Sequence, residues 1–159
     1  MTKPYRCTAP YGWQALLTLI QTEFAAMDGR INPPSSMHRL TADAIAEQAA
    51  TAEVWAIGSP PVACVFLTPR LHSLDTASLY IGKLAVARSQ RRQGLARALI
   101  ATAETRARAL LLPALELQTR VELTENHDTF RALGFVEVAR TAHPGYSHPT
   151  TITFRRPVP

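Results

Sequence analysis

The sequence predicts an α+β fold with a strand–helix–strand crossover in the middle of the chain. Apolar residues recur at helical spacing in the first 50 residues, whereas residues 53–86 contain short apolar runs separated by turn residues. Helical spacing returns after residue 94, and shorter strands follow. This succession is typical of one mixed sheet covered by helices.

Size and composition fit one globular domain. The chain has 159 residues, of which 47% are hydrophobic and 18% charged, and its formal net charge is +5. We therefore expect a single domain over residues 1–159. No apolar run approaches the roughly 20 residues of a membrane span, and the N-terminus lacks an apolar signal-peptide core. These features predict a cytoplasmic protein with no membrane partner.

Two helices are expected in the N-terminal part of the chain. Residues 14–27 carry an apolar stripe at helical spacing, and Gly29 is a suitable left-handed cap. Thr41 is a candidate N-cap for a second helix that ends near residue 50. A short strand near Tyr5 is expected before both helices.

The rest of the chain alternates between strand and helix patterns. Strands are expected over residues 53–57, 62–68 and 78–86, and Pro113 ends the helix that follows. The later expected elements are a helix over 95–111, a strand over 114–118, a helix over 126–133 that stops at Gly134, and strands over 135–139 and 151–154.

The stretch LAVARSQRRQGLARALI (84–100) places three arginines and a glycine between an expected strand and an expected helix. The first N–H groups of a helix lack internal partners and carry partial positive charge, which makes an anion site. Gly94 leaves room for a ligand's phosphates, and Arg91 and Arg92 add charge that suits a diphosphate. The alternative interpretation is a solvated arginine loop that only caps a helix.

Several other functions fit the sequence less well. The loop lacks the Lys-Ser/Thr pair of a P-loop and the three glycines of a dinucleotide fingerprint. Basic residues concentrate at 88–108 and near the C-terminus without interleaved aromatic residues, which disfavours nucleic acid as a partner. Histidine and cysteine spacings indicate no metal site, and Cys7 and Cys64 indicate no disulfide framework.

The segment RRQGLA (91–96) resembles the [QR]-x-x-G-x-[GA] signature of the GNAT superfamily of N-acetyltransferases. YIGKLAV (80–86) is similar to the fourth strand of that family, and FRALGF (130–135) is similar to the LYxxLGF end of its fourth helix. The resemblance is best over residues 53–139. It implies a GNAT-like mixed, mostly antiparallel central sheet with helices on both faces and with splayed fourth and fifth strands.

The same resemblance implies acetyl-CoA as co-substrate and direct attack of an amine on its thioester in a ternary complex. The end of the fourth strand, here Leu84, Ala85 and Val86, would bond the pantetheine arm. The amine would belong to a small molecule or to a protein, and a homodimer, common in the family, is compatible with the sequence. Residues implied around the pyrophosphate are Arg91, Arg92, Gln93, Gly94, Leu95, Ala96 and Arg97.

The sequence departs from the family pattern in the second half of the site. Phe130 occupies the position of the tyrosine that usually protonates the thiolate, so Tyr146, His127 or water must take that role. Asn126 lies about one helical turn nearer to Gly134 than the asparagine of many family members. We expect Asn126 and Phe130 to border the cofactor; the alternative for Asn126 is a helix N-cap. His127 is expected to be exposed after that cap.

The sequence also leaves the general base unassigned. The family's usual acidic residue on the fourth strand is absent from SLYIGKLAV, where Lys83 is the charged residue. Glu23, Glu122 and Glu125 are candidates that the sequence does not rank. The turn over 143–148, rich in histidine and proline, is expected to border the acceptor. The alternative to an enzyme is a non-catalytic acyl-CoA-binding regulatory module, which Phe130 would favour.

Overall fold

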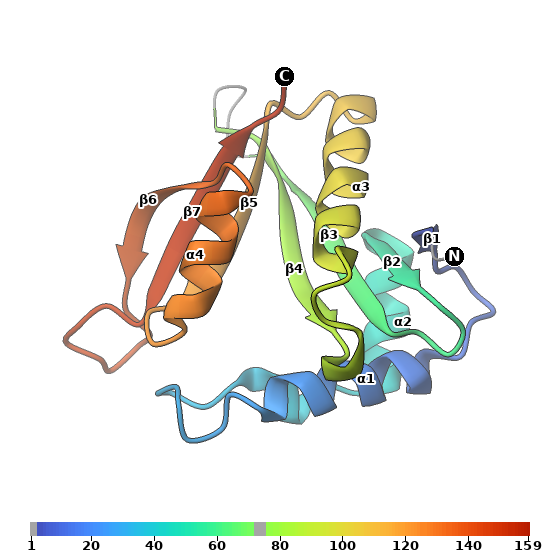
Figure 1. The fold of residues 1–159 in the computed structure, drawn as a ribbon, viewed down its shortest axis with the longest axis horizontal. Helices are drawn as coiled ribbons and strands as arrows, with labels where there is room; N and C mark the ends of the chain where they lie inside the picture. The colour runs from blue at the N-terminus through green and yellow to red at the C-terminus, as the bar shows by residue number, and fades with distance from the viewer. Residues whose placement is uncertain (1–2, 72–75) are drawn as a thin grey trace.

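The computed structural model describes residues 3–71 and 76–159 and contains a seven-stranded sheet in the order β1-β2-β3-β4-β5-β7-β6 (Figure 1). Neighbouring strands are antiparallel except for the parallel pair β4–β5. The predicted α+β class with a mostly antiparallel mixed sheet is therefore confirmed. The strands are β1 (Tyr5–Arg6), β2 (Glu53–Ile57), β3 (Ala63–Arg70), β4 (Ser78–Val86), β5 (Ala114–Arg120), β6 (Val136–Thr141) and β7 (Thr151–Pro157).

Helices cover both faces of the sheet. Thr41 caps α2 as predicted, because its Oγ1 accepts the Ala44 N–H at 3.1 Å. In the described residues, no helix combines the length and apolar character needed to cross a bilayer. The helices are α1 (Trp13–Ala25), α2 (Ala42–Thr51), α3 (Leu95–Ala109) and α4 (Thr124–Ala132), with short 3-10 turns η1 (Ser36–Arg39) and η2 (Arg88–Gln90).

Side chains from alternate positions of the central strands feed two separate cores. In β3, Val65 and Leu67 face the core beneath α3, whereas Cys64 and Phe66 face the core beneath α1 and α2. This alternation follows from the two-residue period of a strand. The sheet is therefore fixed from both sides where β3 and β4 cross the molecule.

The central crossover runs from β4 through α3 to β5, as the sequence predicts. Leu99 of α3 is fully buried against this sheet, together with Ala103 and Ala107 of the same helical face. Leu95, the first residue of α3, is buried in the same core, so the start of α3 is anchored on the strands that it connects.

Candidate active site

The site is built around a splay between β4 and β5. The two strands pair only from Leu79 to Ile81, opposite Leu115 to Leu117. Beyond Ile81 they diverge toward the end of the molecule that α1 crosses, as Figure 1 shows. The predicted separation of the fourth and fifth strands is therefore present.

A bulge in β4 explains where the divergence begins. Cys64 pairs with Ala85 and Phe66 with Gly82, so β4 has one residue more than β3 in this interval. Lys83 within it has φ of 48°, in the left-handed region. Such a bulge bends a strand and increases its twist, which turns the end of β4 away from β5.

The free edge of β4 offers backbone groups to a ligand. The Ala87 N–H donates to Val62 O at 2.8 Å, toward β3. Because backbone groups alternate along a strand, those of Val86 point to the opposite, open side. This is the region, Leu84 to Val86, in which the sequence predicts pantetheine contacts.

The arginine-rich loop leads into α3 with an open helix N-terminus. Arg92 and Gly94 both have positive φ, 66° and 76°, and Gly94 is the N-cap without a side-chain cap bond. A Cβ built on Gly94 has no atom within 4 Å. The N-terminus of α3 is therefore open beside Gly94, as an anion site requires.

The residues predicted to bind the diphosphate differ in exposure: the side chains of the loop are exposed, whereas Leu95 is buried. Arg91, Arg92, Gln93 and Arg97 are exposed, whereas the Leu95 side chain is buried in the core, so only its backbone is available to a ligand. A hollow lies between α3 and the end of α4. Its lining residues are Arg97, Ile100, Ala101, Glu104, Ala132, Leu133 and Arg156.

On the β5 side, α4 begins two residues earlier than predicted, and Asn126 is not its cap. The N-cap is Leu123, and Asn126 lies in the first turn, where its Nδ2 donates to Thr119 Oγ1 at 3.4 Å. The N-cap alternative for Asn126 is therefore wrong. Phe130, further along α4, is half-buried against Phe154, with ring centroids 6.2 Å apart.

His127 is buried, so the expectation of an exposed ring is wrong. Its Nε2–H donates to the Arg120 carbonyl at 2.9 Å, and its ring lies 6.1 Å from that of Phe154. This bond ties α4 to the end of β5. The His127 ring therefore holds α4 against the end of β5.

Tyr146 lies on the same side of the opening as α4, in the β6–β7 loop. Its hydroxyl donates to Asn32 Oδ1 at 2.6 Å. Asn32 belongs to the segment 26–35 between α1 and η1, which we call the bridging segment. Tyr146 thus links the C-terminal half of the sheet to the N-terminal helices.

Further bonds fix the bridging segment across the open end of the splay. Arg30 Nη2 donates to both carboxylate oxygens of Glu125, at 2.8 and 2.7 Å. Arg120 Nη1 donates to the Pro33 carbonyl at 2.6 Å. Sequence reasoning missed this segment, because only the run Pro33-Pro34-Ser35-Ser36 marks it, as a loop.

The three unranked glutamates are now distinguishable by their partners. Both carboxylate oxygens of Glu125 accept from Arg30, and Glu23 Oε1 accepts from Arg91 Nη2 at 3.1 Å. Glu122 Oε2 accepts the Asn32 N–H at 3.1 Å, while its Oε1 is buried without a partner among the described residues. Lys83 instead donates to Gln48 Oε1 at 3.0 Å, and burial lowers the pKa of Lys83.

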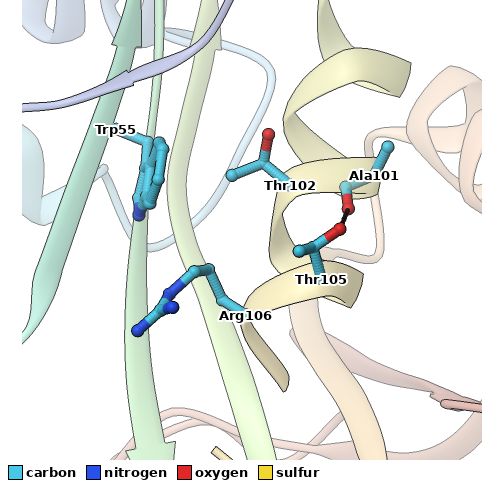
Figure 2. A pocket seen from close by; sticks show the side chains of 5 residues that line it. All are labelled: Trp55, Ala101, Thr102, Thr105 and Arg106. Carbon is cyan, nitrogen blue, oxygen red and sulfur yellow. Dashed lines mark hydrogen bonds between the residues drawn. The ribbon is translucent and has the colours of Figure 1, made fainter. Parts of the chain in front are cut away.

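A second hollow lies between β2 and α3, where Trp55 faces Thr102 and Arg106 (Figure 2). Arg106 makes a bidentate pair with Glu53, at 2.8 and 2.9 Å. β2 and β5 lie on opposite sides of the β3–β4 pair in the sheet, so this hollow is separate from the splay. Across residues 3–71 and 76–159, no group of three His, Cys, Asp or Glu side chains is arranged to hold a metal ion.

The fold combines an open mixed sheet, a splayed parallel pair β4–β5 and an uncapped N-terminus of α3. These are the features of an acyltransferase fold. The sequence matches the acetyltransferase (GNAT) family over residues 13–135. The chain belongs to this family. Comparison with curated protein sequences gives no significant match.

Solved structures of this family share the fold across the full chain. A GNAT acetyltransferase from Staphylococcus aureus Mu50 superposes with a TM-score of 0.73 at 14% identity, covering 100% of both chains. The ribosomal-protein-S18-alanine N-acetyltransferase from Escherichia coli gives 0.70 at 18% identity, covering 99% of this chain and 94% of the other. A GNAT acetyltransferase from Elizabethkingia anophelis with acetyl-CoA bound gives 0.66 at 15%, covering 98% and 97%.

Proposed function

We propose that this protein is an N-acetyltransferase that moves the acetyl group of acetyl-CoA to an amine by direct attack within a ternary complex. The observation that carries the proposal is the open N-terminus of α3, led by Gly94, at the mouth of the β4–β5 splay. Family membership supports acyl transfer as the reaction class. The acceptor is an amine on a small molecule or on a protein.

In this proposal the loop before α3 binds the diphosphate of acetyl-CoA. The N–H groups of residues 92–96 would donate to phosphate oxygens, and Arg91, Arg92 and Arg97 would supply charge. The pantetheine arm would run along Leu84 to Val86. Acetyl-CoA bound in the Elizabethkingia neighbour supports this choice of co-substrate.

The opposite wall would be formed by α4. Asn126 lies on the first turn of α4 and points toward Thr119 of β5, and Phe130 lies one turn further on. Phe130 contributes apolar surface and carries no proton for the thiolate. The acid must therefore come from another residue or from water.

Tyr146 is our choice for the general acid, with His127 second. A phenol hydroxyl within hydrogen-bond reach of the departing sulfur can act as its general acid. Among the described residues, the Tyr146 hydroxyl bonds to Asn32 alone, at a half-buried position, whereas the His127 Nε2–H is bonded inside the fold. Tyr146 would have to exchange its Asn32 bond for the thiolate sulfur.

The test of the function is release of CoA thiol from acetyl-CoA in a panel of small amines, amino acids and peptide N-termini. Amine-dependent release, with acetyl-CoA affinity measured separately by calorimetry, would support the enzyme. Binding of acetyl-CoA without release for any amine would instead support a non-catalytic acyl-CoA-binding module.

Tyr146→Phe tests the acid. We expect it to lower the maximal rate about 10²-fold or more while leaving acetyl-CoA affinity nearly intact. His127→Gln keeps a donor for the Arg120 carbonyl and serves as the comparison. Wild-type rates in both variants would assign protonation to solvent.

A further inference from the structure

Glu122, at the open end of the splay, has a buried carboxylate oxygen that accepts no hydrogen bond from the described residues. Both oxygens of Glu125 accept from Arg30, and Glu23 accepts from Arg91 of the diphosphate loop. Glu122 Oε2 accepts the Asn32 N–H at 3.1 Å, whereas its Oε1 is buried and has no hydrogen-bond partner among the described residues.

A buried carboxylate oxygen without a donor is unusual, because each such oxygen loses its hydration without compensation. The neighbouring cation does not remove the deficit. The Arg120 guanidinium directs its N–H groups to the carbonyls of Pro33 and Pro34, at 2.6 and 3.4 Å. Burial lowers the pKa of Arg120, and the negative charge of Glu122 opposes that shift, so the two charges are close without the guanidinium bonding Oε1.

Asn32 places this carboxylate next to the acid proposed above. Its backbone N–H holds Glu122 Oε2, and its side-chain Oδ1 accepts from the Tyr146 hydroxyl at 2.6 Å. One residue of the bridging segment therefore orients a proton donor and a proton acceptor together. β4, which faces this carboxylate across the splay, has no acidic residue.

We propose that Glu122, on the turn after β5, binds the acceptor as an ammonium ion through Oε1 and removes its proton; this rests on the proposed function. The ammonium N–H bond breaks, its proton goes to the carboxylate, and the freed electron pair attacks the thioester carbon. The C–S bond then breaks, and the sulfur takes the Tyr146 proton. The new amide nitrogen returns a proton to Tyr146, and Glu122 releases its own to solvent.

This assignment selects a class of acceptor. An alkyl amine with a pKa near that of lysine, about 10.4, is neutral in roughly one molecule per thousand or fewer at pH 7. It requires both a counter-ion and a base. An aromatic amine is already neutral at that pH and requires neither, so Glu122 favours primary alkyl amines.

The test compares Glu122→Gln with Glu137→Gln. Glutamine preserves the shape of each side chain and an acceptor for its partner, and Glu137 pairs with Arg140 at an exposed position on β6, away from the open end of the splay, so we expect Glu137→Gln to stay within about twofold of wild type. For an alkyl amine at pH 7, Glu122→Gln should lower kcat/KM about 10²-fold or more. Its acetyl-CoA affinity and unfolding temperature should match those of wild type.

The pH profile and the acceptor type separate proton removal from a structural role. In Glu122→Gln, kcat/KM should rise about tenfold per pH unit toward the amine pKa, as free amine accumulates. The loss should be much smaller for an aromatic amine. Glu122→Asp, which retains a displaced carboxylate, should fall between Glu122→Gln and wild type.

The outcomes also separate this proposal from the proposed function. Alkyl-amine turnover that persists in Glu122→Gln at all pH values would overturn the role of Glu122 and leave the acetyltransferase intact. An equal loss for alkyl and aromatic amines would overturn it as well. A wild-type protein that acetylates no amine would overturn both.

Discussion

Gly94 occupies a position where a side chain would point into open space rather than against the protein. Its φ is 76°, and a Cβ there has no atom within 4 Å. We expect Gly94→Glu to weaken acetyl-CoA binding at least tenfold, about 1.4 kcal/mol, because a carboxylate would stand where the diphosphate is proposed. Isothermal titration calorimetry measures the change directly.

Gly29 provides the matched control for this substitution. Its φ is 79°, and its Cβ position is equally open, so Gly29→Glu carries the same backbone strain outside the arginine loop. Acetyl-CoA affinity should stay within about twofold in this variant. Unchanged affinity in a folded Gly94→Glu protein would refute the diphosphate position.

Phe130→Tyr tests whether the absence of a tyrosine hydroxyl at this position limits the reaction. Its ring is half-buried, 6.1 Å from Phe135 and 6.2 Å from Phe154. Because part of the ring reaches the surface, we expect Phe130→Tyr to keep or raise kcat without unfolding the protein. A large loss of kcat would mean that the cofactor packs against the ring edge.

Phe135→Tyr is the comparison for that result. Phe135 is 1% exposed, so the same hydroxyl would be buried without a partner and should lower the free energy of unfolding by about 1–3 kcal/mol. Thermal unfolding distinguishes the two variants.

At the scale of single elements, the start of α2 can be tested by removing the side chain of its N-cap residue, Thr41. Thr41 Oγ1 accepts the Ala44 N–H, and Thr41→Ala should cost about 1 kcal/mol of unfolding free energy. For a chain of this size that corresponds to about 2–4 °C in Tm. Differential scanning calorimetry provides the measurement.

Thr18 offers the control within α1. Its Oγ1 donates to the Gln14 carbonyl one turn back, at an exposed position, a bond that adds little to helix stability. Thr18→Ala should therefore leave Tm unchanged or slightly higher, since alanine has the better helix propensity. A Thr41→Ala protein as stable as Thr18→Ala would contradict the importance of the cap.

The strength of each element's sequence signal decided how well it was predicted. Strands β2 and β4 have the predicted bounds, since both are apolar runs enclosed by turn residues. Helix α4 was predicted to start at Asn126 but starts at Thr124. Its first turn is fixed by the His127 bond to the Arg120 carbonyl, a tertiary contact that no local pattern records.

At the scale of the whole molecule, the sheet separates two cores that should respond independently. Leu99 is fully buried beneath α3, and Ile20 is fully buried beneath α1 on the other face. Leu99→Ala should cost about 2–5 kcal/mol and Ile20→Val about 0.5–1.5 kcal/mol. In the double variant the two losses should add within about 0.5 kcal/mol, measured by urea unfolding.

A clear departure from additivity would show that the faces are coupled through the sheet. The apolar stripes of α1 and α3 can be predicted from the sequence, because apolar residues repeat there at helical spacing. The two faces of β3 cannot, because its first five residues are all apolar and buried.

The sequence by itself determined the fold class, the central crossover and the loop led by Gly94. Each of these depends on local chemistry: apolar periodicity, a glycine at a helix start, and arginines beside it. It also identified Phe130 as a departure from the family pattern.

Only the tertiary structure decided which polar residues meet at the open end. Asn32, Glu122 and Tyr146 lie far apart in the chain, and they meet because the bridging segment crosses the splay. Burial and hydrogen-bond partners then distinguish Glu122 from Glu23 and Glu125. Both properties depend on contacts between distant segments, and residue type and spacing do not encode such contacts.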